Sequence, residues 1–127
     1  GVINKDLADV IAGMGHTDSL VVADAGLPIP AGVRRIDLAV CEGVPGFLTT
    51  VEVIAKELQV ERIFVAQEME IHSPHILEGL TRILAGVEIT KVPHSDFKEL
   101  CRNTTAVVRT GEFTWYANVI LVSGVIF

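Results

Sequence analysis

The sequence predicts an α/β fold with three layers, in which a central, mostly parallel and possibly mixed sheet is flanked by helices. Two observations support this prediction. Short β-branched, apolar runs alternate along the chain with segments whose apolar residues recur every three or four positions, which is the pattern of strands alternating with amphipathic helices. The chain has 127 residues, half of them hydrophobic and a fifth charged, which suits one domain spanning residues 1–127 with a single core.

The first half of the chain is predicted to alternate helix, strand, strand and helix. Asn4 can cap the first helix, whose apolar stripe Gly15 can terminate. Two prolines, which lack amide donors, exclude regular structure from residues 25–30 and predict a stiff loop there. The predicted elements are a helix over 4–14, strands over 19–24 and 35–40, and a helix whose apolar pattern runs from Phe47 to Leu58.

The second half continues this alternation. Pro74 fits the first turn of a helix, and Ser95 can cap a shorter one. Because helices separate the strands, right-handed crossovers and parallel pairing are expected, with the last two strands free to pair differently. Strands are predicted over 62–66, 87–92, 105–109 and 118–124, and helices over 73–84 and 95–100.

Composition argues against several classes of protein. No apolar run approaches the ~20 residues that cross a bilayer, and the first residues lack the pattern of a secretory signal. A net charge of −6 without a basic stripe argues against a nucleic-acid surface. Cys41 and Cys101 lie far apart in apolar surroundings, so we expect two buried, reduced thiols rather than a disulfide or a zinc site. A cytoplasmic location and a charge-poor surface partly buried by partners are expected.

His16 and Asp24 flank the first predicted strand. His16 carries an imidazole that suits acid–base chemistry near neutral pH, although a helix-terminal residue that bonds the last carbonyls fits the local pattern equally well. Asp24 stands at the carboxyl end of the strand, where open α/β sheets bind ligands. Taken alone, Asp24 fits a turn-capping role better. His16 changes that balance only if the two side chains meet.

Two further segments hold candidate binding residues. His94 follows a strand and begins a helix, so it can reach the same edge of the sheet or stand in solvent at the helix start. Residues 112–118 contain the only Trp and the only Tyr, Trp115 and Tyr116, next to Asn118. Stacking area beside donors and acceptors suits a sugar, whose faces are apolar and whose rim is hydroxylated. The aromatic pair suits subunit packing equally well.

Other patterns argue against metal, nucleotide or covalent chemistry. Pro74 lies between His72 and His75 and no third ligand has a convincing spacing, so a solvated helix start is preferred over a zinc site. Glu68 and Glu70 are interpreted as a solvated strand exit rather than as a catalytic pair. P-loop, GxGxxG and GxSxG motifs are absent from the sequence. We therefore expect neither a metal nor a cofactor.

Five motifs carry a family resemblance that covers essentially the whole chain in order. They are Gly15-His16-Thr17-Asp18, Leu20 through Pro30, Arg35-Ile36-Asp37, Gly43-Val44-Pro45, and Arg109-Thr110-Gly111-Glu112 through Tyr116-Ala117-Asn118. Together they closely resemble the ribose pyranase and fucose mutarotase family. The segment from Asp24 to Pro30 is the most specific part, and residues 66–92 are more individual.

The resemblance implies an activity, a site and an assembly. The implied reaction converts the β-pyranose form of D-ribose to the β-furanose form by ring opening, rotation and reclosure, and so supplies the furanose for ribose catabolism. General acid–base chemistry suffices for this reaction. The family also implies a homo-oligomer, often two stacked pentamers, with the site at a subunit boundary. The implied site residues are His16 as proton donor, with Asp24, His94, Tyr116, Ala117 and Asn118 binding the sugar.

Other functions stay open on the sequence. L-fucose mutarotation uses the same acid–base chemistry on another sugar, but Gly26 and Leu27 stand where the fucose branch tends to have a histidine and an aromatic residue. A sugar-binding module without turnover would need similar polar residues, yet it would not need a well-placed histidine. A purely structural subunit of an oligomer would leave the polar strand ends unexplained.

Overall fold

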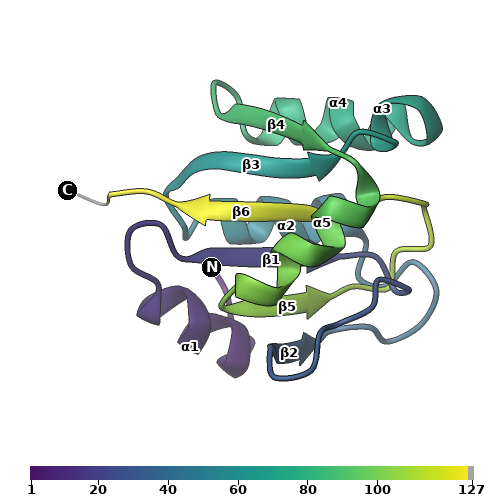
Figure 1. Cartoon of the computed structure of the whole chain (residues 1–127). Helices are drawn as coiled ribbons and strands as arrows, with labels where there is room; N and C mark the ends of the chain where they lie inside the picture. Colours follow the sequence, from purple (N-terminus) through teal and green to yellow (C-terminus); the bar gives the residue numbers. More distant parts are fainter. Residues whose placement is uncertain (126–127) are drawn as a thin grey trace.

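The computed structural model describes residues 1–125, which form a six-stranded sheet with helices on both faces (Figure 1). The strands lie in the order β2-β5-β1-β6-β3-β4. Central strand β1 is buried on both faces, because Val22 packs into one core and Val21 into the other, which explains its unbroken apolar run. The strands are β1 Ser19–Ala23, β2 Arg34–Asp37, β3 Val60–Ala66, β4 Glu88–Val92, β5 Ala106–Arg109 and β6 Val119–Ser123.

The sheet is mixed. Strand β5 pairs in parallel with β1 and β2, and β3 pairs in parallel with β4. Strand β6 lies between these two sets and is antiparallel to both β1 and β3. The chain reaches β6 from a loop at the carboxyl end of β5, so it returns in the opposite direction without a crossover helix. The prediction of a mostly parallel, possibly mixed sheet is confirmed.

The helices form the two outer layers. Helices α1, α2 and α4 contribute Leu7, Val51 and Leu80 to the larger core, whereas α5 contributes Phe97 to the smaller core. Figure 1 shows α5 crossing one face of the sheet, with α2 and α4 behind the other face. The three-layer prediction is therefore confirmed. The helices are α1 Lys5–Gly13, α2 Phe47–Ala55, α3 Met69–His72, α4 Pro74–Ile83 and α5 His94–Leu100, followed by a 3-10 turn, η1 Cys101–Asn103.

Two helix starts follow the predicted local chemistry. The Asn4 side chain accepts a hydrogen bond of 2.9 Å from the Leu7 amide, which satisfies one of the unpaired donors in the first turn of α1. Pro74 occupies the first turn of α4, where its missing N–H has no cost. Both predictions of helix starts are confirmed.

The region around residues 38–44 differs from the prediction. Strand β2 ends at Asp37 rather than at residue 40, because the amides of Val40 and Cys41 both donate to the Val44 carbonyl, at 2.9 and 3.4 Å, and close a turn. This turn exposes Cys41, so the prediction of two buried thiols is wrong for Cys41. Cys101 is buried as expected, and its burial raises the pKa of the thiol to about 11.

The connections around β4 also differ in detail. A short helix, α3, precedes α4 and was not predicted; Met69, its first residue, is fully buried. Helix α5 begins at His94 after Pro93 and has no side-chain cap, so the predicted Ser95 cap is wrong. Glu68 is not a solvated strand exit, because its carboxylate accepts hydrogen bonds from the His94 amide at 3.0 and 3.2 Å.

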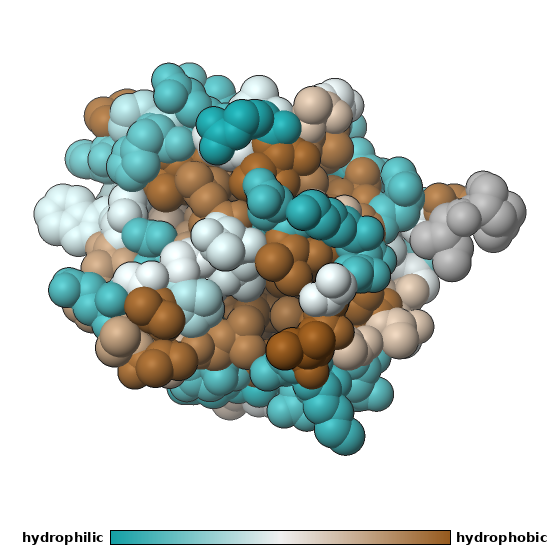
Figure 2. Space-filling view, turned by 180° about the vertical axis from the view of Figure 1, so that it is seen from behind, coloured by the Kyte–Doolittle hydropathy of each residue, from teal (hydrophilic) through white to brown (hydrophobic). Residues whose placement is uncertain are grey.

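One face of the molecule combines polar rims with an apolar middle. Seen from behind in Figure 2, hydrophobic residues gather across the centre of the face, with hydrophilic residues above and below them. Within residues 1–125, every helix is too short or too polar to cross a membrane.

Candidate active site

A pocket of about 720 Å³ opens at the edge of the sheet where β1 and β5 end and β6 begins. Its walls come from the loop after β1, the first turn of α5, and the segment that connects β5 to β6. Successive loops leave a crevice at this edge, and open α/β sheets bind ligands there. The lining residues are Asp24, Ala25, Gly26, Leu27, Pro28, His94, Arg109, Glu112, Phe113, Trp115 and Tyr116.

Asp24 is held in the pocket by the buried side chain of Asn118. The Asp24 amide donates to Asn118 Oδ1 at 2.8 Å, and Asn118 Nδ2 donates to Asp24 Oδ2 at 3.1 Å. The other carboxylate oxygen accepts from the Gly26 amide at 3.0 Å, so Asp24 also caps a turn. Burial raises the pKa of Asp24 above its ordinary value, although hydrogen bonds from Gly26 and Asn118 oppose this rise. Asp24 therefore caps a turn, as the local pattern favoured, and also lines the pocket.

His94 enters the pocket from the start of α5. Its ring meets the Tyr116 ring edge to face, with centroids 5.1 Å apart, and stacks on Phe97 at 6.3 Å. Burial, followed by the nearby Lys98 ammonium, lowers the pKa of His94 below its ordinary value of 6.5. The ring is therefore neutral at neutral pH, and it can accept or donate a hydrogen bond to a sugar hydroxyl.

The segment 116–118 closes the pocket with an unusual backbone. Tyr116 has a φ of 61°, in the left-handed region that residues other than glycine seldom adopt. Such strain persists where the surroundings hold it, commonly at functional sites. Ala117 is fully buried in the larger core, and the buried side chain of Asn118 contacts Asp24. Of these three predicted sugar-binding residues, only Tyr116 lines the pocket.

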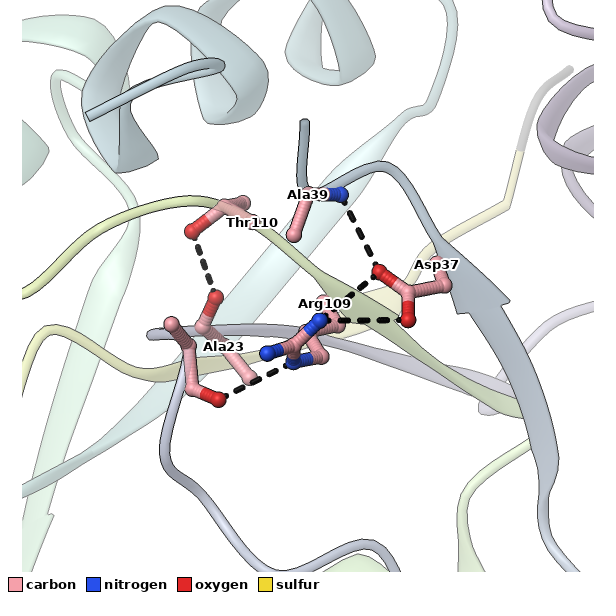
Figure 3. A network of polar contacts seen from close by, with 6 residues as sticks. Ala23, Asp37, Ala39, Arg109 and Thr110 are labelled. Atoms are coloured by element: carbon pink, nitrogen blue, oxygen red, sulfur yellow. Dashed lines mark hydrogen bonds and ion pairs between the residues drawn. The ribbon is translucent and has the colours of Figure 1, made fainter. Parts of the chain in front are cut away.

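Arg109 ties the loop after β1 to neighbouring strands (Figure 3). Its Nε donates to the Ala25 carbonyl at 2.9 Å, and its Nη1 lies 3.2 Å from each carboxylate oxygen of Asp37. The next side chain, Thr110, donates from Oγ1 to the Ala23 carbonyl at 2.7 Å. Side chains at the end of β5 therefore hold both the end of β1 and the loop that follows it. The loop that carries Asp24 is thus fixed by side-chain hydrogen bonds as well as by its prolines.

Glu112 is a pocket residue that sequence reasoning did not single out. Its carboxylate accepts hydrogen bonds from the Phe47 amide at 3.0 Å and from Thr114 Oγ1 at 2.7 Å. Burial alone would raise the pKa of Glu112, but these hydrogen bonds outweigh it and hold the pKa below its ordinary value. Glu112 therefore links the start of α2 to the loop bearing Tyr116. The available signal was its position just beyond a strand end, in one of the motifs quoted above.

His16 lies away from this pocket. It precedes β1, whereas Asp24 follows β1, so the strand separates the two residues. Strand β1 has five residues, and at a rise of about 3.3 Å per residue it is roughly 17 Å long. His16 and Asp24 lie beyond its two ends. The His16 ring instead contacts Glu61 of β3, with Nε2 3.2 Å from Oε1. Within one chain, His16 and Asp24 do not meet.

Two other histidines lie near the pocket rim. The exposed His72 ring is 5.4 Å from the Tyr116 ring, and His75 is close enough to Glu112 to help lower its pKa. The preferred interpretation of a solvated helix start agrees with the exposure of both residues. In residues 1–125, no group of three or more His, Cys, Asp or Glu side chains could hold a metal ion.

Comparison with known proteins identifies the family. The profile of the RbsD / FucU transport protein family matches residues 1–126. This chain belongs to that family. Among its relatives, D-ribose pyranase of Laribacter hongkongensis is 54% identical over 100% of this chain and 97% of its own length. D-ribose pyranase of Chloroflexus aggregans is 53% identical, over 99% of this chain and 96% of its own length.

Solved structures of the RbsD / FucU family share the fold. Bacillus subtilis RbsD complexed with D-ribose is 44% identical, with a TM-score of 0.98 over 100% of this chain and 97% of that chain. The Streptococcus pneumoniae fucose mutarotase in complex with L-fucose is 28% identical, with a TM-score of 0.85 over 98% of this chain and 95% of that chain. The family resemblance and the α/β fold expected from the sequence are confirmed.

Proposed function

We propose that this protein is an isomerase that interconverts the β-pyranose and β-furanose forms of D-ribose. The observation that carries the proposal is its backbone similarity, with a TM-score of 0.98, to the RbsD structure complexed with D-ribose. The pocket also suits a free sugar, because aromatic and aliphatic walls surround a few polar groups, among them Asp24 and His94. Relatives named D-ribose pyranase, about half identical over nearly the full chain, give the same substrate.

Ribose is preferred to fucose as the substrate. The relatives named D-ribose pyranase are 46–55% identical to this chain, whereas the fucose mutarotase complexed with L-fucose is 28% identical. Gly26 and Leu27, which differ from the residues typical of the fucose branch, line the pocket. Different side chains at this wall would alter which hydroxyl and methyl groups a sugar can present there.

Ring interconversion requires two proton movements. As the bond between C1 and the ring oxygen breaks, that oxygen gains a proton from an imidazolium, and the anomeric hydroxyl loses a proton to water, leaving an aldehyde. After rotation, the C4 hydroxyl attacks C1, the imidazole takes the proton of this hydroxyl, and the carbonyl oxygen gains one from water. We assign the imidazole to His16. A positioned general acid or base of this kind typically increases the reaction rate by a factor of about 10² to 10⁴. Asp24 accepts hydrogen bonds from sugar hydroxyls, and Tyr116 holds the ring edge.

This role for His16 requires a second copy of the chain. Because His16 and Asp24 lie at opposite ends of β1, His16 of one copy must complete the pocket of another. Phe113 and Trp115, which line the pocket, are 61% and 73% exposed, and exposed aromatic groups of this kind favour an interface between subunits. We therefore propose a homo-oligomer with shared sites, for which the family resemblance suggests two stacked pentamers.

Exchange NMR on free sugars tests the function. The protein should accelerate pyranose–furanose exchange of D-ribose and leave the exchange of L-fucose anomers at its uncatalysed rate. The His16→Ala variant should lose most of the acceleration while ribose affinity, measured by titration calorimetry, stays nearly unchanged. Full exchange activity in His16→Ala would refute the role of His16, and acceleration with fucose alone would refute the choice of substrate.

Subunit mixing tests the shared site. His16→Ala lacks the imidazole, and Asp24→Leu lacks the sugar acceptor, so each variant alone should be inactive. Co-expression should restore about one quarter of the wild-type sites, because pocket and imidazole are drawn independently from two equal pools of chains. If the mixed oligomers were as inactive as each variant alone, one chain would have to supply both residues, and the proposal of shared sites would be refuted.

A further inference from the structure

Glu61 contacts His16 from a neighbouring strand. His16 Nε2 and Glu61 Oε1 are 3.2 Å apart, and the two side chains are 51% and 38% exposed. The imidazole is therefore free on one side and held by a carboxylate on the other. A carboxylate accepts hydrogen bonds and does not donate them, so Nε2 carries the proton in this contact. The second ring nitrogen, Nδ1, is left for other partners.

A β-bulge places Glu61 in this position. Val60 of β3 pairs with Ser123 of β6, but Arg62 pairs with Val122, so three residues of β3 oppose two of β6. Glu61 is the extra residue. Bulges bend a strand locally and re-aim a side chain, and they are enriched next to active sites. A regular ladder at this point would turn the side chains that follow to the other face of the sheet.

The segment that carries His16 is fixed to the same end of β6. Thr17 has a φ of 71°, in the left-handed region, and its amide donates to the Ser123 carbonyl at 2.8 Å. The Gly15 amide donates to the Asp18 carboxylate at 2.8 Å, which closes a turn around His16. Backbone strain of this kind is kept only where contacts on both sides over-determine it. Ser123, which contacts Thr17 and pairs with Val60, therefore joins the two halves of the His16–Glu61 contact.

We propose that Glu61 is the positioning residue of the proton donor His16. Glu61 holds Nε2–H and fixes the ring orientation, so that Nδ1 is the atom that exchanges the proton with the sugar ring oxygen. When Nδ1–H gives its proton to the ring oxygen, the C1–oxygen bond breaks and the imidazole stays bonded through Nε2–H to the Glu61 carboxylate. This inference rests on the proposed function of His16 and deepens it by naming the nitrogen and its orienting group.

An ordinary surface ion pair is the competing explanation, because such pairs contribute little to stability. Arg102 and Glu99 form one on the surface, 3.0 Å apart and more exposed than His16 and Glu61. Glu99→Gln is therefore a matched control, since it removes one carboxylate from an exposed ion pair outside the pocket. A role for Glu61 in catalysis should separate these two substitutions, whereas a role in surface charge alone should not.

Steady-state exchange kinetics on ribose make this comparison. Glu61→Gln should lower kcat about tenfold, the lower end of the effect seen when the carboxylate partner of a metal-binding histidine is removed, with KM and the calorimetric Kd for ribose nearly unchanged. Glu99→Gln should retain wild-type kcat. The thermal midpoints of both variants should match the wild type. A Glu61→Gln enzyme with wild-type kcat, or one with normal kcat and a raised KM, overturns the positioning role.

The protonation of the His16 ring nitrogens can be observed directly in the wild-type protein. The protein has four histidines, so a solid-state ¹⁵N spectrum of histidine-labelled protein is simple, and His16→Ala assigns the missing pair of signals. At high pH the neutral ring should show Nε2 protonated and Nδ1 bare, and Glu61→Ala should narrow the separation of the two signals as both tautomers become populated. A wild-type ring protonated at Nδ1 overturns the proposal.

The two sets of measurements separate the possible failures. If His16→Ala exchanges ribose at the wild-type rate, the proposed function of His16 fails, whatever the tautomer. If His16→Ala is inactive but Glu61→Gln equals the wild type, His16 keeps its role and only the positioning by Glu61 fails.

Discussion

Replacing Asn118 with alanine tests whether this buried amide holds Asp24 in its sugar-binding position. Asn118 is 1% exposed, and its side chain makes hydrogen bonds of 2.8 and 3.1 Å to the amide and carboxylate of Asp24. Alanine removes both hydrogen bonds at once. The Asp24 carboxylate then loses one of the contacts that oppose the effect of burial, so its pKa should rise further.

The expected loss of stability follows from these two contacts. A hydrogen bond between neutral groups contributes about 0.5–1.5 kcal/mol and one to a charged group about 1.5–3 kcal/mol. Water from the open pocket can replace part of the bond to the carboxylate, so the lower part of the summed range applies, about 2 kcal/mol. For a chain of this length, the melting temperature should fall by roughly 6–10 °C.

Thermal unfolding followed by circular dichroism at fixed protein concentration measures this loss, and titration calorimetry measures ribose affinity. Asn118→Ala should melt earlier and bind ribose about tenfold more weakly, since about 1.4 kcal/mol of orientation free energy corresponds to that factor. Asn103→Ala, at the exposed end of η1, is the control and should melt like the wild type. An Asn118→Ala protein with wild-type melting and wild-type affinity would refute the reasoning.

Two further predictions concern Asp24 and Gly111. Because burial raises the pKa of Asp24 above 3.8, ribose affinity should start to fall on acidification at a pH above the ordinary aspartate range. Asp24→Asn should bind ribose weakly at every pH. If the affinity of this variant still fell on acidification, protonation of Asp24 would not be the cause. The same shift means that the folded state holds the proton more tightly, so the contribution of Asp24 to stability falls as pH rises from 3.8 through the raised pKa. A Cβ on Gly111 would clash with the carbonyl oxygens of Cys41 and Val44. Gly111→Ala should therefore lower the free energy of unfolding by about 1–3 kcal/mol or more, and the melting temperature should fall with it. Normal melting of Gly111→Ala would show that the turn at Val44 can yield.

Local patterns predicted most of the elements because their causes are local. The Asn4 cap, the Pro74 start of α4 and the apolar run of β1 each depend on a few neighbouring residues. The predictions failed where a contact distant in sequence or a tight turn decides the outcome. The end of β2 depends on a turn at Val44, and the role of Glu68 depends on His94, 26 residues away.

The candidate site divides in the same way. The sequence by itself placed Asp24 and His94 just after predicted strands and Tyr116 in an aromatic segment, and the family resemblance implied that all three bind one sugar. All three line one pocket. Only the tertiary structure decided that Asn118 holds Asp24 and that Glu112 links α2 to the Tyr116 loop. The reason is that these contacts join segments 65 to 94 residues apart, and no local pattern encodes them.

His16 is the sharpest case. The residues around His16 fit acid–base chemistry and a helix end equally well, and it is the family resemblance that implies a proton donor there. The direction of β1 decided that the His16 imidazole lies at the opposite end of the strand from Asp24, and the bulge in β3 decided that Glu61 is its neighbour. Strand direction and register follow from how the whole sheet pairs, because one added residue re-aims every side chain beyond it. The sequence could therefore single out His16, whereas the pairing of the sheet determines which groups its imidazole can reach.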